Sequence, residues 1–375
     1  MPYYQFSIPE VYKTWNWSQR FPDHNELKAY FRHVDKVLGL SKDISYNTAV
    51  TGADFDDHSG RWTIRTSTGQ TLTCKFLIPA TGSSYKRYEP EFSGMKSYKG
   101  QIIHAASWPA SGIDFTGKDV AVIGAGATGV QLVQEISKSA RHLTAYIRNP
   151  NIAIPMGQRD ISDLENRAQK SIYKSLFKVA RETAAGIACD PQPLAASEVT
   201  EEEQQAYLEE LWARGGFSFQ AANYRDFLVD LKTNKMVYDF WAKKTRERIR
   251  DPAKADVVAP LKQPYPVATK RCSLEQDYYE ALSKDHVDVV GLKQTPIREF
   301  SANGIVTEDG KEKHHDYIVL ATGYDNMTGS LTSMGLRGRD GVDMKERWGD
   351  GVWTYLGVMS SGNPNMFMIY GPQGK

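Results

Sequence analysis

The feature that most constrains the fold is the stretch "DVAVIGAGATGVQLVQEISKSA", which begins at Asp119. An apolar, strand-like run leads into Gly124-x-Gly126-x-x-Gly129, a helical pattern follows, and "LTAYI" reads as a second strand. In such a unit the first glycine permits a tight turn, the second lets a pyrophosphate approach the backbone, and the third lets helix and strand pack closely. The helix N-terminus supplies free amides and a favourable dipole for an anion. The motif has the strand–turn–helix context that its mechanism requires, so it predicts a dinucleotide-binding α/β unit.

Arg148 and Asn149 follow the second strand of this unit. An NAD-binding unit carries an acidic residue there, which binds the ribose 2′-hydroxyl. A cation instead neutralises a 2′-phosphate, and Asn149 can add a hydrogen bond. The sequence therefore favours NADP over NAD, although an exposed strand-end arginine is the alternative interpretation.

The rest of the chain predicts further strands around a helical region. The runs "NTAVTGADF", "RWTIRTSTG" and "TLTCKFLIPATG" indicate a β-meander, and we expect the last run to be a buried strand that ends at Gly82. A loop should connect it to Asp119. Residues 160–251 have helical periodicity, with a capping box at Thr200 and Glu203. Strands should return in three later runs: "VDVVG", "IREFSANGIVTEDG" and "DYIVLATGYD".

Composition excludes several classes of protein. The 46 Lys and Arg residues balance 45 Asp and Glu residues, so nothing suggests a field built for nucleic acid or an anionic membrane, and any anion site must be local. No run approaches the roughly 18 apolar residues of a membrane span, and the N-terminus does not resemble a signal peptide. Cys74, Cys189 and Cys272 lie far apart, which argues against a disulfide framework or a zinc site. We therefore expect a cytoplasmic protein.

Two further clusters contain candidate chemical groups. Lys270 and Arg271 are adjacent in "PYPVATKRCSLEQDYYE". On an extended segment they would point to opposite sides, so one can face a phosphate and the other a reaction centre; a solvated basic pair is the alternative. His314 and His315 predict no metal site, because adjacent histidines diverge and no third ligand has suitable spacing. Three residues at helical spacing are interpreted as core: Tyr207, Leu211 and Trp212.

The chain resembles a known family, the Baeyer–Villiger monooxygenases of the class B flavoproteins. The family fingerprint F-x-G-x-x-x-H-x-x-x-W is matched by Tyr98, Gly100, His104 and Trp108, with Tyr in place of Phe. The glycine motif, "IRNP", "TKR" with "LEQDYYE", and "VLATGYD" also occur in family order. The likeness runs from about Tyr4 to Tyr370, and an ordered set of motifs is more specific than any one of them.

The resemblance implies FAD and NADP as cofactors, and it assigns residues to them. Arg148 and Asn149 match the pair at the 2′-phosphate, and Lys270 matches a second phosphate contact. Arg271 matches the catalytic arginine. Tyr4 and Val50 match flavin-contacting positions. The pyrophosphate loop is matched by Gly124, Ala125, Gly126, Ala127, Thr128, Gly129, Val130 and Gln131.

The implied reaction inserts one oxygen atom of O₂ next to a ketone carbonyl. NADPH reduces FAD, oxygen adds to the flavin, and the resulting C4a-peroxide attacks the ketone to give an ester or lactone. The guanidinium of Arg271 would favour the anionic nucleophile. His104 and Trp108 would lie between the flavin and NADP domains and couple domain movement to cofactor binding; the alternative is a packed linker with a hydrogen-bonded histidine.

The sequence departs from the family at both ends. No first G-x-G-x-x-G motif precedes Tyr4, and the chain stops at "MFMIYGPQGK". The expected fold is therefore an incomplete FAD-binding Rossmann-like domain, residues 1–110 and 281–375, around an inserted NADP-binding Rossmann domain. That inserted domain spans 111–280 and contains a helical insertion at about 160–255. A non-catalytic NADP-binding remnant and a heteroatom- or N-hydroxylating flavoprotein remain alternative functions.

Overall fold

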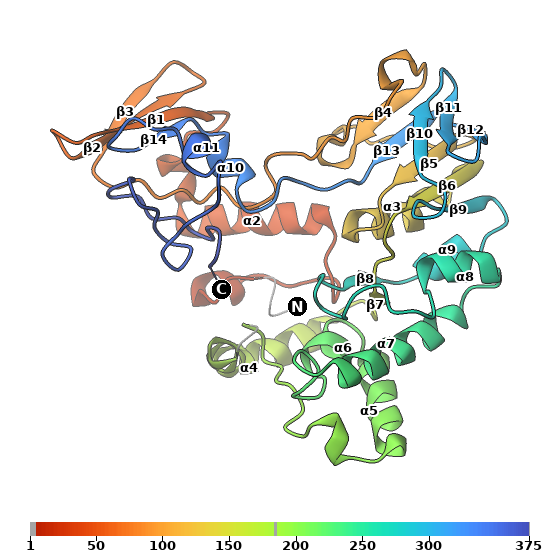
Figure 1. Cartoon of the computed structure of the whole chain (residues 1–375). Helices are drawn as coiled ribbons and strands as arrows, with labels where there is room; N and C mark the ends of the chain where they lie inside the picture. Colours follow the sequence, from red (N-terminus) through yellow and green to blue (C-terminus); the bar gives the residue numbers. More distant parts are fainter. Residues whose placement is uncertain (1–4, 184–185, 375) are drawn as a thin grey trace. The chain divides into compact units, whose positions relative to one another are not determined.

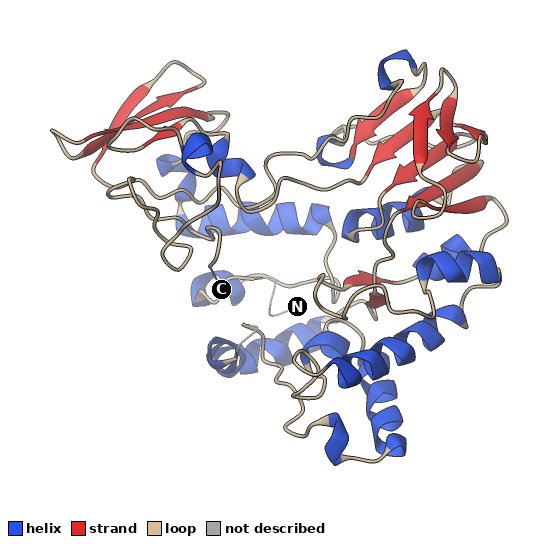
Figure 2. Cartoon of the chain, viewed as in Figure 1, coloured by secondary structure: helices blue, strands red, loops and turns tan. Residues whose placement is uncertain are grey.

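The computed structural model describes residues 5–183 and 186–374, and the chain forms two compact units (Figures 1 and 2). The first unit comprises Met1–Lys42 and Glu91–Ala321, and the second comprises Asp43–Pro90 and Thr322–Lys375. Each unit has a hydrophobic core and is described by itself.

A five-stranded parallel sheet forms the centre of the first unit, in the order β4-β13-β5-β6-β9. Alternate residues of β5 face opposite layers: Val120 and Val122 join one core cluster, whereas Ala121 and Ile123 join another. Both faces are covered, as a parallel sheet requires, and this explains the almost continuous apolar runs. The strands are β4 (Gln101–His104), β13 (Tyr317–Leu320), β5 (Asp119–Ile123), β6 (His142–Ile147) and β9 (Val287–Gly291).

The predicted βαβ unit is confirmed, because α3 (Ala127–Ile136) connects β5 to the parallel strand β6. The predicted helical region is confirmed as well. The hydroxyl of Thr200 accepts the amide of Glu203 at 3.3 Å, and the Glu203 carboxylate accepts the amide of Thr200 at 2.8 Å. The helices of this region are α4 (Asp163–Glu182), α5 (Glu201–Arg214), α6 (Ser218–Ala221), α7 (Leu231–Arg246) and α8 (Pro252–Val258).

Smaller elements complete the first unit. A short parallel ribbon pairs β7 (Ala153–Pro155) with β8 (Ser273–Glu275), and α9 (Tyr278–Leu282) follows it. An antiparallel sheet contains β10 (Ile297–Phe300), β11 (Gly304–Thr307) and β12 (Glu312–His314). At the N-terminal side, α1 (Pro9–Tyr12) and α2 (His24–Leu38) share an aromatic-rich core with Ile161, next to the start of α4. Short 3₁₀-helices lie at Leu40–Asp43, Met95–Ser97, Ala105–Ser107 and Ala196–Glu198.

The second unit contains the predicted β-meander, in the order β14-β1-β2-β3. Trp62 is fully buried in its core, where its indole N–H donates to the carbonyl of Pro364 at 2.9 Å. The elements are β1 (Val50–Asp56), β2 (Arg61–Thr66), β3 (Thr71–Cys74), β14 (Leu336–Arg337), α10 (Gly329–Thr332) and α11 (Met344–Arg347).

Two sequence-based expectations were wrong. The run "TLTCKFLIPATG" is not a buried strand: β3 ends at Cys74, and Phe76 and Ile78 are more than half exposed. Backbone hydrogen bonds join Leu77 to Asn365 and Phe367, so this extended segment is paired on that side. The loop before Asp119 also contains an unexpected strand, because "QIIH" forms β4 at the edge of the parallel sheet.

None of the helices in the described part of the chain is long and apolar enough to cross a bilayer.

Candidate functional site

The glycine turn between β5 and α3 has a different steric constraint at each glycine. Gly124 has φ +115°, and a Cβ there would lie 2.4 Å from the carbonyl oxygen of Ala321. A Cβ at Gly129 would lie 2.1 Å from the carbonyl oxygen of Gly124, so only glycine lets α3 pack this closely on the turn. At Gly126, by contrast, an added Cβ would meet nothing within 4 Å. Gly126 thus faces open space at the start of the helix, which is where a pyrophosphate would approach.

The start of α3 offers hydrogen-bond donors. Gly126 is the N-cap residue and supplies no side-chain acceptor, and the first intrahelical bond runs from the amide of Val130 to the carbonyl of Gly126 at 2.9 Å. The amides of residues 127–129 precede that bond and therefore have no intrahelical acceptor. Ala127 and Thr128 are exposed, as is Gln131 one turn further on, whereas Ala125 is buried. These are the features by which a helix start can bind an anion.

Arg148 and Asn149 lie directly after the end of β6. Arg148 is exposed, and no acidic side chain of the described residues pairs with its guanidinium. Its charge is therefore available for a ligand, and the position at the carboxyl end of a parallel strand is where nucleotides bind in open α/β sheets.

The β7–β8 ribbon brings the two predicted cationic segments together. Ala153 pairs with Ser273 in parallel, so the residues that precede each strand lie at the same end of the ribbon. These are Arg148 and Asn149 before β7, and Lys270 and Arg271 before β8. A hydrogen bond from the amide of Ser273 to the side chain of Asn151, at 3.3 Å, continues the pairing toward that end.

Tyr265 provides a direct connection between these two segments. Its hydroxyl donates to the carbonyl of Pro150 at 2.7 Å, one residue after Asn149. The ammonium of Lys270 lies 4.7 Å from the centroid of the same ring. Lys270 is therefore held near the end of β6 while its charge stays exposed. The sequence interpretation missed Tyr265, because its role depends on a contact across 115 residues.

Arg271 is exposed and supported from the helical region. Its guanidinium carbon lies 5.1 Å from the ring centroid of Phe217, and the amide of its neighbour Cys272 donates to Gln220 at 3.4 Å. Burial raises the pKa of the Cys272 thiol to about 12. The thiol thus stays protonated, and the charged group of this pair is the exposed guanidinium.

The sequence also assigned Tyr4 and Val50 to flavin contacts. Tyr4 is outside the described residues. Val50, 39% exposed, is the first residue of β1 in the second unit.

The fingerprint residues pack around β4. The Tyr98 hydroxyl donates to the carbonyl of His315 at 2.8 Å, and a Cβ at Gly100 would lie 2.2 Å from that hydroxyl. His104 is buried, and its Nδ1 accepts the amide of Ala106 at 3.1 Å. Trp108 lies 6.0 Å, centroid to centroid, from Phe115. These contacts give the fingerprint a structural role in fixing β4, whereas the implied coupling of domain movement stays a prediction.

One argument about metal binding needs correction. The sequence spacing offered no third ligand beside the histidine pair, but the fold brings Asp119 and Asp316 next to His314. The Asp119 carboxylate already pairs with Arg141 at 2.6 Å and with His314 at 3.3 Å. The Asp119 carboxylate therefore already has protein partners at the N-terminal end of the sheet.

Comparison with known proteins places this architecture in a family. A family model for flavin-binding monooxygenase-like proteins matches residues 1–154. The FAD-binding monooxygenase acrE of Aspergillus aculeatus is 43% identical over 371 residues, covering 99% of this chain and 63% of that protein. Cyclopentanone 1,2-monooxygenase of a Comamonas species is 42% identical, covering 99% of this chain and 67% of that protein. The crystal structure of OTEMO in complex with FAD and NADP matches with a TM-score of 0.94 at 33% identity, covering 99% of this chain and 69% of that one.

The fold and the glycine turn define a dinucleotide-binding protein of the α/β class. With these relatives, the chain belongs to the Baeyer–Villiger monooxygenase family of flavin-binding monooxygenases. It spans about two thirds of the length of the curated relatives it matches.

Proposed function

We propose that this chain acts as an FAD- and NADPH-dependent monooxygenase that inserts one oxygen atom of O₂ next to a ketone carbonyl, giving an ester or lactone. The observation that supports this most is the convergence of Arg148 and Asn149 with Lys270 and Arg271 at one end of the β7–β8 ribbon. A ketone substrate is supported by the similarity of the chain to cyclopentanone 1,2-monooxygenase. The proposed cytoplasmic location rests on the sequence, in which the three cysteines lie far apart.

NADPH binding is assigned to the glycine turn and the cationic ends of the ribbon. The amides of residues 127–129 and the open space at Gly126 receive the pyrophosphate. Arg148 neutralises the 2′-phosphate and Asn149 adds a hydrogen bond, while Lys270 supplies a second positive charge. Because Arg148 has no acidic partner among the described residues, ligand binding breaks no ion pair there.

Arg271 is assigned to the chemical step. Bound FAD supplies the redox chemistry, taking a hydride from NADPH and activating O₂. The guanidinium of Arg271 stays charged at any relevant pH and favours negative charge on the oxygen that is transferred. Its stacking on Phe217 keeps that charge in one place without neutralising it. Tyr4 and Val50 remain predicted flavin contacts.

Nucleotide titration tests the assignment of Arg148. Arg148→Ala should weaken NADP⁺ binding by roughly 10–100-fold, the value of a charge-assisted contact, and leave NAD⁺ binding unchanged. Arg141→Ala is the matched control, since Arg141 precedes the other end of β6 and pairs with Asp119. An unaltered ratio of NADP⁺ to NAD⁺ affinity in Arg148→Ala would contradict the phosphate assignment.

Two measurements test the reaction. The chain purified with FAD should show the visible absorbance band of a bound oxidised flavin; without that band, catalysis by this chain alone is untenable. Arg271→Ala should then abolish ester formation from a cyclic ketone while NADPH oxidation continues. Product yield equal to that of the wild type would refute the role of Arg271.

A further inference from the structure

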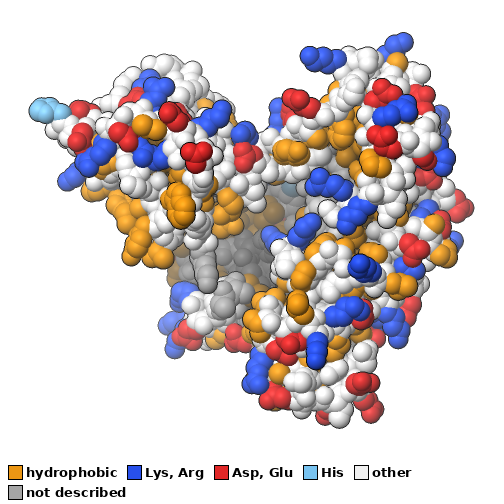
Figure 3. All heavy atoms as spheres, in the orientation of Figure 1, with side chains coloured by type: hydrophobic (Ala, Val, Ile, Leu, Met, Phe, Trp, Pro, Cys, Tyr) orange, Lys and Arg blue, Asp and Glu red, His pale blue; other side chains and the backbone are white. Residues whose placement is uncertain are grey.

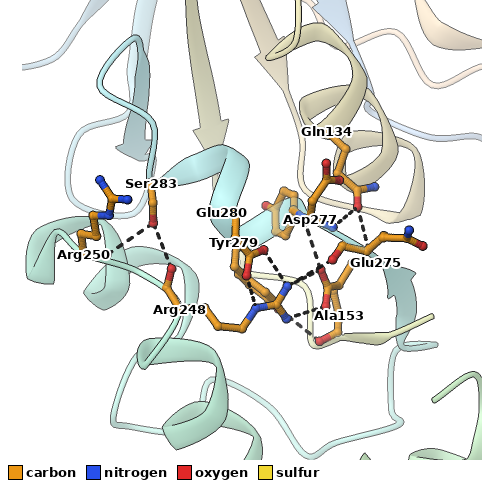
Figure 4. A network of polar contacts seen from close by, with 11 residues as sticks. Gln134, Ala153, Arg248, Arg250, Glu275, Asp277, Tyr279, Glu280 and Ser283 are labelled. Carbon is orange, nitrogen blue, oxygen red and sulfur yellow. Dashed lines mark hydrogen bonds and ion pairs between the residues drawn. The ribbon is translucent and has the colours of Figure 1, made fainter. Parts of the chain in front are cut away.

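Arg248, in the turn after α7, is the centre of a polar network that no sequence motif predicted (Figure 4). Its guanidinium donates to both carboxylate oxygens of Glu275, at 2.7 and 3.0 Å. It also donates to both oxygens of Glu280, at 2.6 and 2.7 Å. The guanidinium is therefore hydrogen-bonded to two carboxylates, one at the end of β8 and the other in α9.

Glu275, the last residue of β8, depends on this network. Its side chain is only 1% exposed, and Arg248 is its cationic partner among the described residues. A buried carboxylate is tolerated only when it is paired and hydrogen-bonded. Burial by itself would lower the pKa of Arg248, but the hydrogen bonds to Glu280 and Glu275 outweigh it and raise that pKa. Arg248 thus fixes the downstream end of β8.

The same side chain reaches the other strand of the ribbon through Tyr279. The guanidinium carbon of Arg248 lies 5.1 Å from the centroid of the Tyr279 ring. The Tyr279 hydroxyl donates to the carbonyl of Ala153, the first residue of β7, at 3.2 Å. Arg248 is therefore linked to both strands of the ribbon: it contacts Glu275 of β8 directly and Ala153 of β7 through Tyr279.

The glycine-turn helix is tied to the same segment. Gln134 of α3 is buried, and its side-chain oxygen accepts the amides of Gln276 and Asp277 at 2.8 and 3.1 Å (Figure 4). The end of β8 is thus held by hydrogen bonds on two sides, to Gln134 of α3 and to Arg248. Lys270 and Arg271 lie just before β8. Because this strand is only three residues long, the backbone position of the two residues depends on the position of the strand.

We infer that Arg248 is a positioning residue for Lys270 and Arg271, which sets where their charges stand relative to the nucleotide. The inference rests on the proposed function, because it takes the nucleotide to be NADPH. In this inference Arg248 acts through Glu275 and the register of the ribbon, and it is assigned no direct contact with the nucleotide or the ketone.

A double-mutant cycle on NADP⁺ affinity tests this. Arg248→Met and Lys270→Ala should each weaken NADP⁺ binding about tenfold, and the double variant should lose little more than Lys270→Ala alone. Lys254→Met is the matched control: its ammonium also ties down this region, through the carbonyls of Leu282, Lys284 and Val287, but it does not touch β8. It should lower the melting temperature and leave the affinity unchanged.

Arg248→Lys keeps the positive charge but cannot make the bidentate hydrogen bonds of a guanidinium. It is the variant to use if Arg248→Met does not fold, and it should weaken NADP⁺ binding by about threefold. The inference would be overturned if the losses of NADP⁺ affinity in the two single variants added up in the double variant. It would also be overturned by wild-type affinity in folded Arg248→Met or Arg248→Lys. In either case the proposed function would stand. If the wild-type chain binds no NADP⁺, the proposed function fails, and the inference fails with it.

Discussion

A buried histidine at the N-terminal end of the parallel sheet makes the first unit sensitive to mild acid. His315 is 2% exposed, and its Nε2 lies 3.0 Å from the hydroxyl of Tyr146. Its Nδ1 is buried and has no hydrogen-bond partner among the described residues. Burial, together with the electrostatic effect of the neighbouring His314 and Lys313, lowers the pKa of His315 from 6.5 to about 3. The folded chain therefore holds this imidazole neutral.

The direction of the pH effect follows from proton counting. Between pH 6.5 and about 3 the unfolded chain binds a proton on His315 and the folded chain does not, so the free energy of unfolding falls as the pH falls. Each pH unit below 6.5 costs at most about 1.4 kcal/mol, so going from pH 7 to pH 5 should cost about 2 kcal/mol. That is a large share of the roughly 5–15 kcal/mol that stabilises a typical domain. Most carboxylates titrate below pH 5, so they contribute little to the change between pH 7 and pH 5.

Urea unfolding at pH 7 and pH 5 measures the effect. His315→Gln removes the titrating group and keeps a polar partner for Tyr146, so this variant should lose about 2 kcal/mol less than the wild type over that interval. His314→Gln is the control, because the neighbouring ring is 56% exposed and should leave the loss in place. An equal loss in His315→Gln and wild type would refute the reasoning.

Three substitutions give further expected outcomes. Gly129→Ala drives a Cβ to within 2.1 Å of the Gly124 carbonyl oxygen and should cost about 2–4 kcal/mol in thermal unfolding, with loss of NADP⁺ binding. Gly126→Ala meets no atom within 4 Å, so it should melt like the wild type yet bind NADP⁺ more than tenfold more weakly; normal binding would contradict a pyrophosphate there. Thr200→Ala removes the capping box with Glu203 and should lower the free energy of unfolding by about 1 kcal/mol in urea titration, without affecting nucleotide binding.

The regular parts of the fold could be predicted because their signals are local. The βαβ unit around Gly124 combines an apolar strand, a glycine turn and helical periodicity within 30 residues, and each part appears as expected. The capping box at Thr200 is equally local. The packing of Leu211, fully buried, and of the partly buried Tyr207 and Trp212 follows from helical spacing.

Hydrophobicity alone was misleading after β3. The apolar run around Phe76 and Ile78 reads as a buried strand, yet both side chains are more than half exposed. An apolar pattern shows that a segment prefers a partner, but it does not show which partners are present. The pairing of Leu77 with residues 365–367 depends on a segment almost 300 residues away. The partners of charged residues are equally hard to predict from sequence, because Asp119 and His314 come together only in the folded chain.

The charges on the surface contain little information about the site by themselves. The face drawn in Figure 3 carries both acidic and basic side chains, and the chain as a whole has 46 Lys and Arg residues against 45 Asp and Glu residues. What distinguishes Arg148, Lys270 and Arg271 is their position at one end of a parallel ribbon whose strands are three residues each. Strands that short have no periodicity to detect. The downstream end of β8 is hydrogen-bonded to Arg248, in the turn after α7, and to Gln134 of α3. A sequence can thus name the cationic residues of such a site, but their convergence has to come from the packing that holds the ribbon.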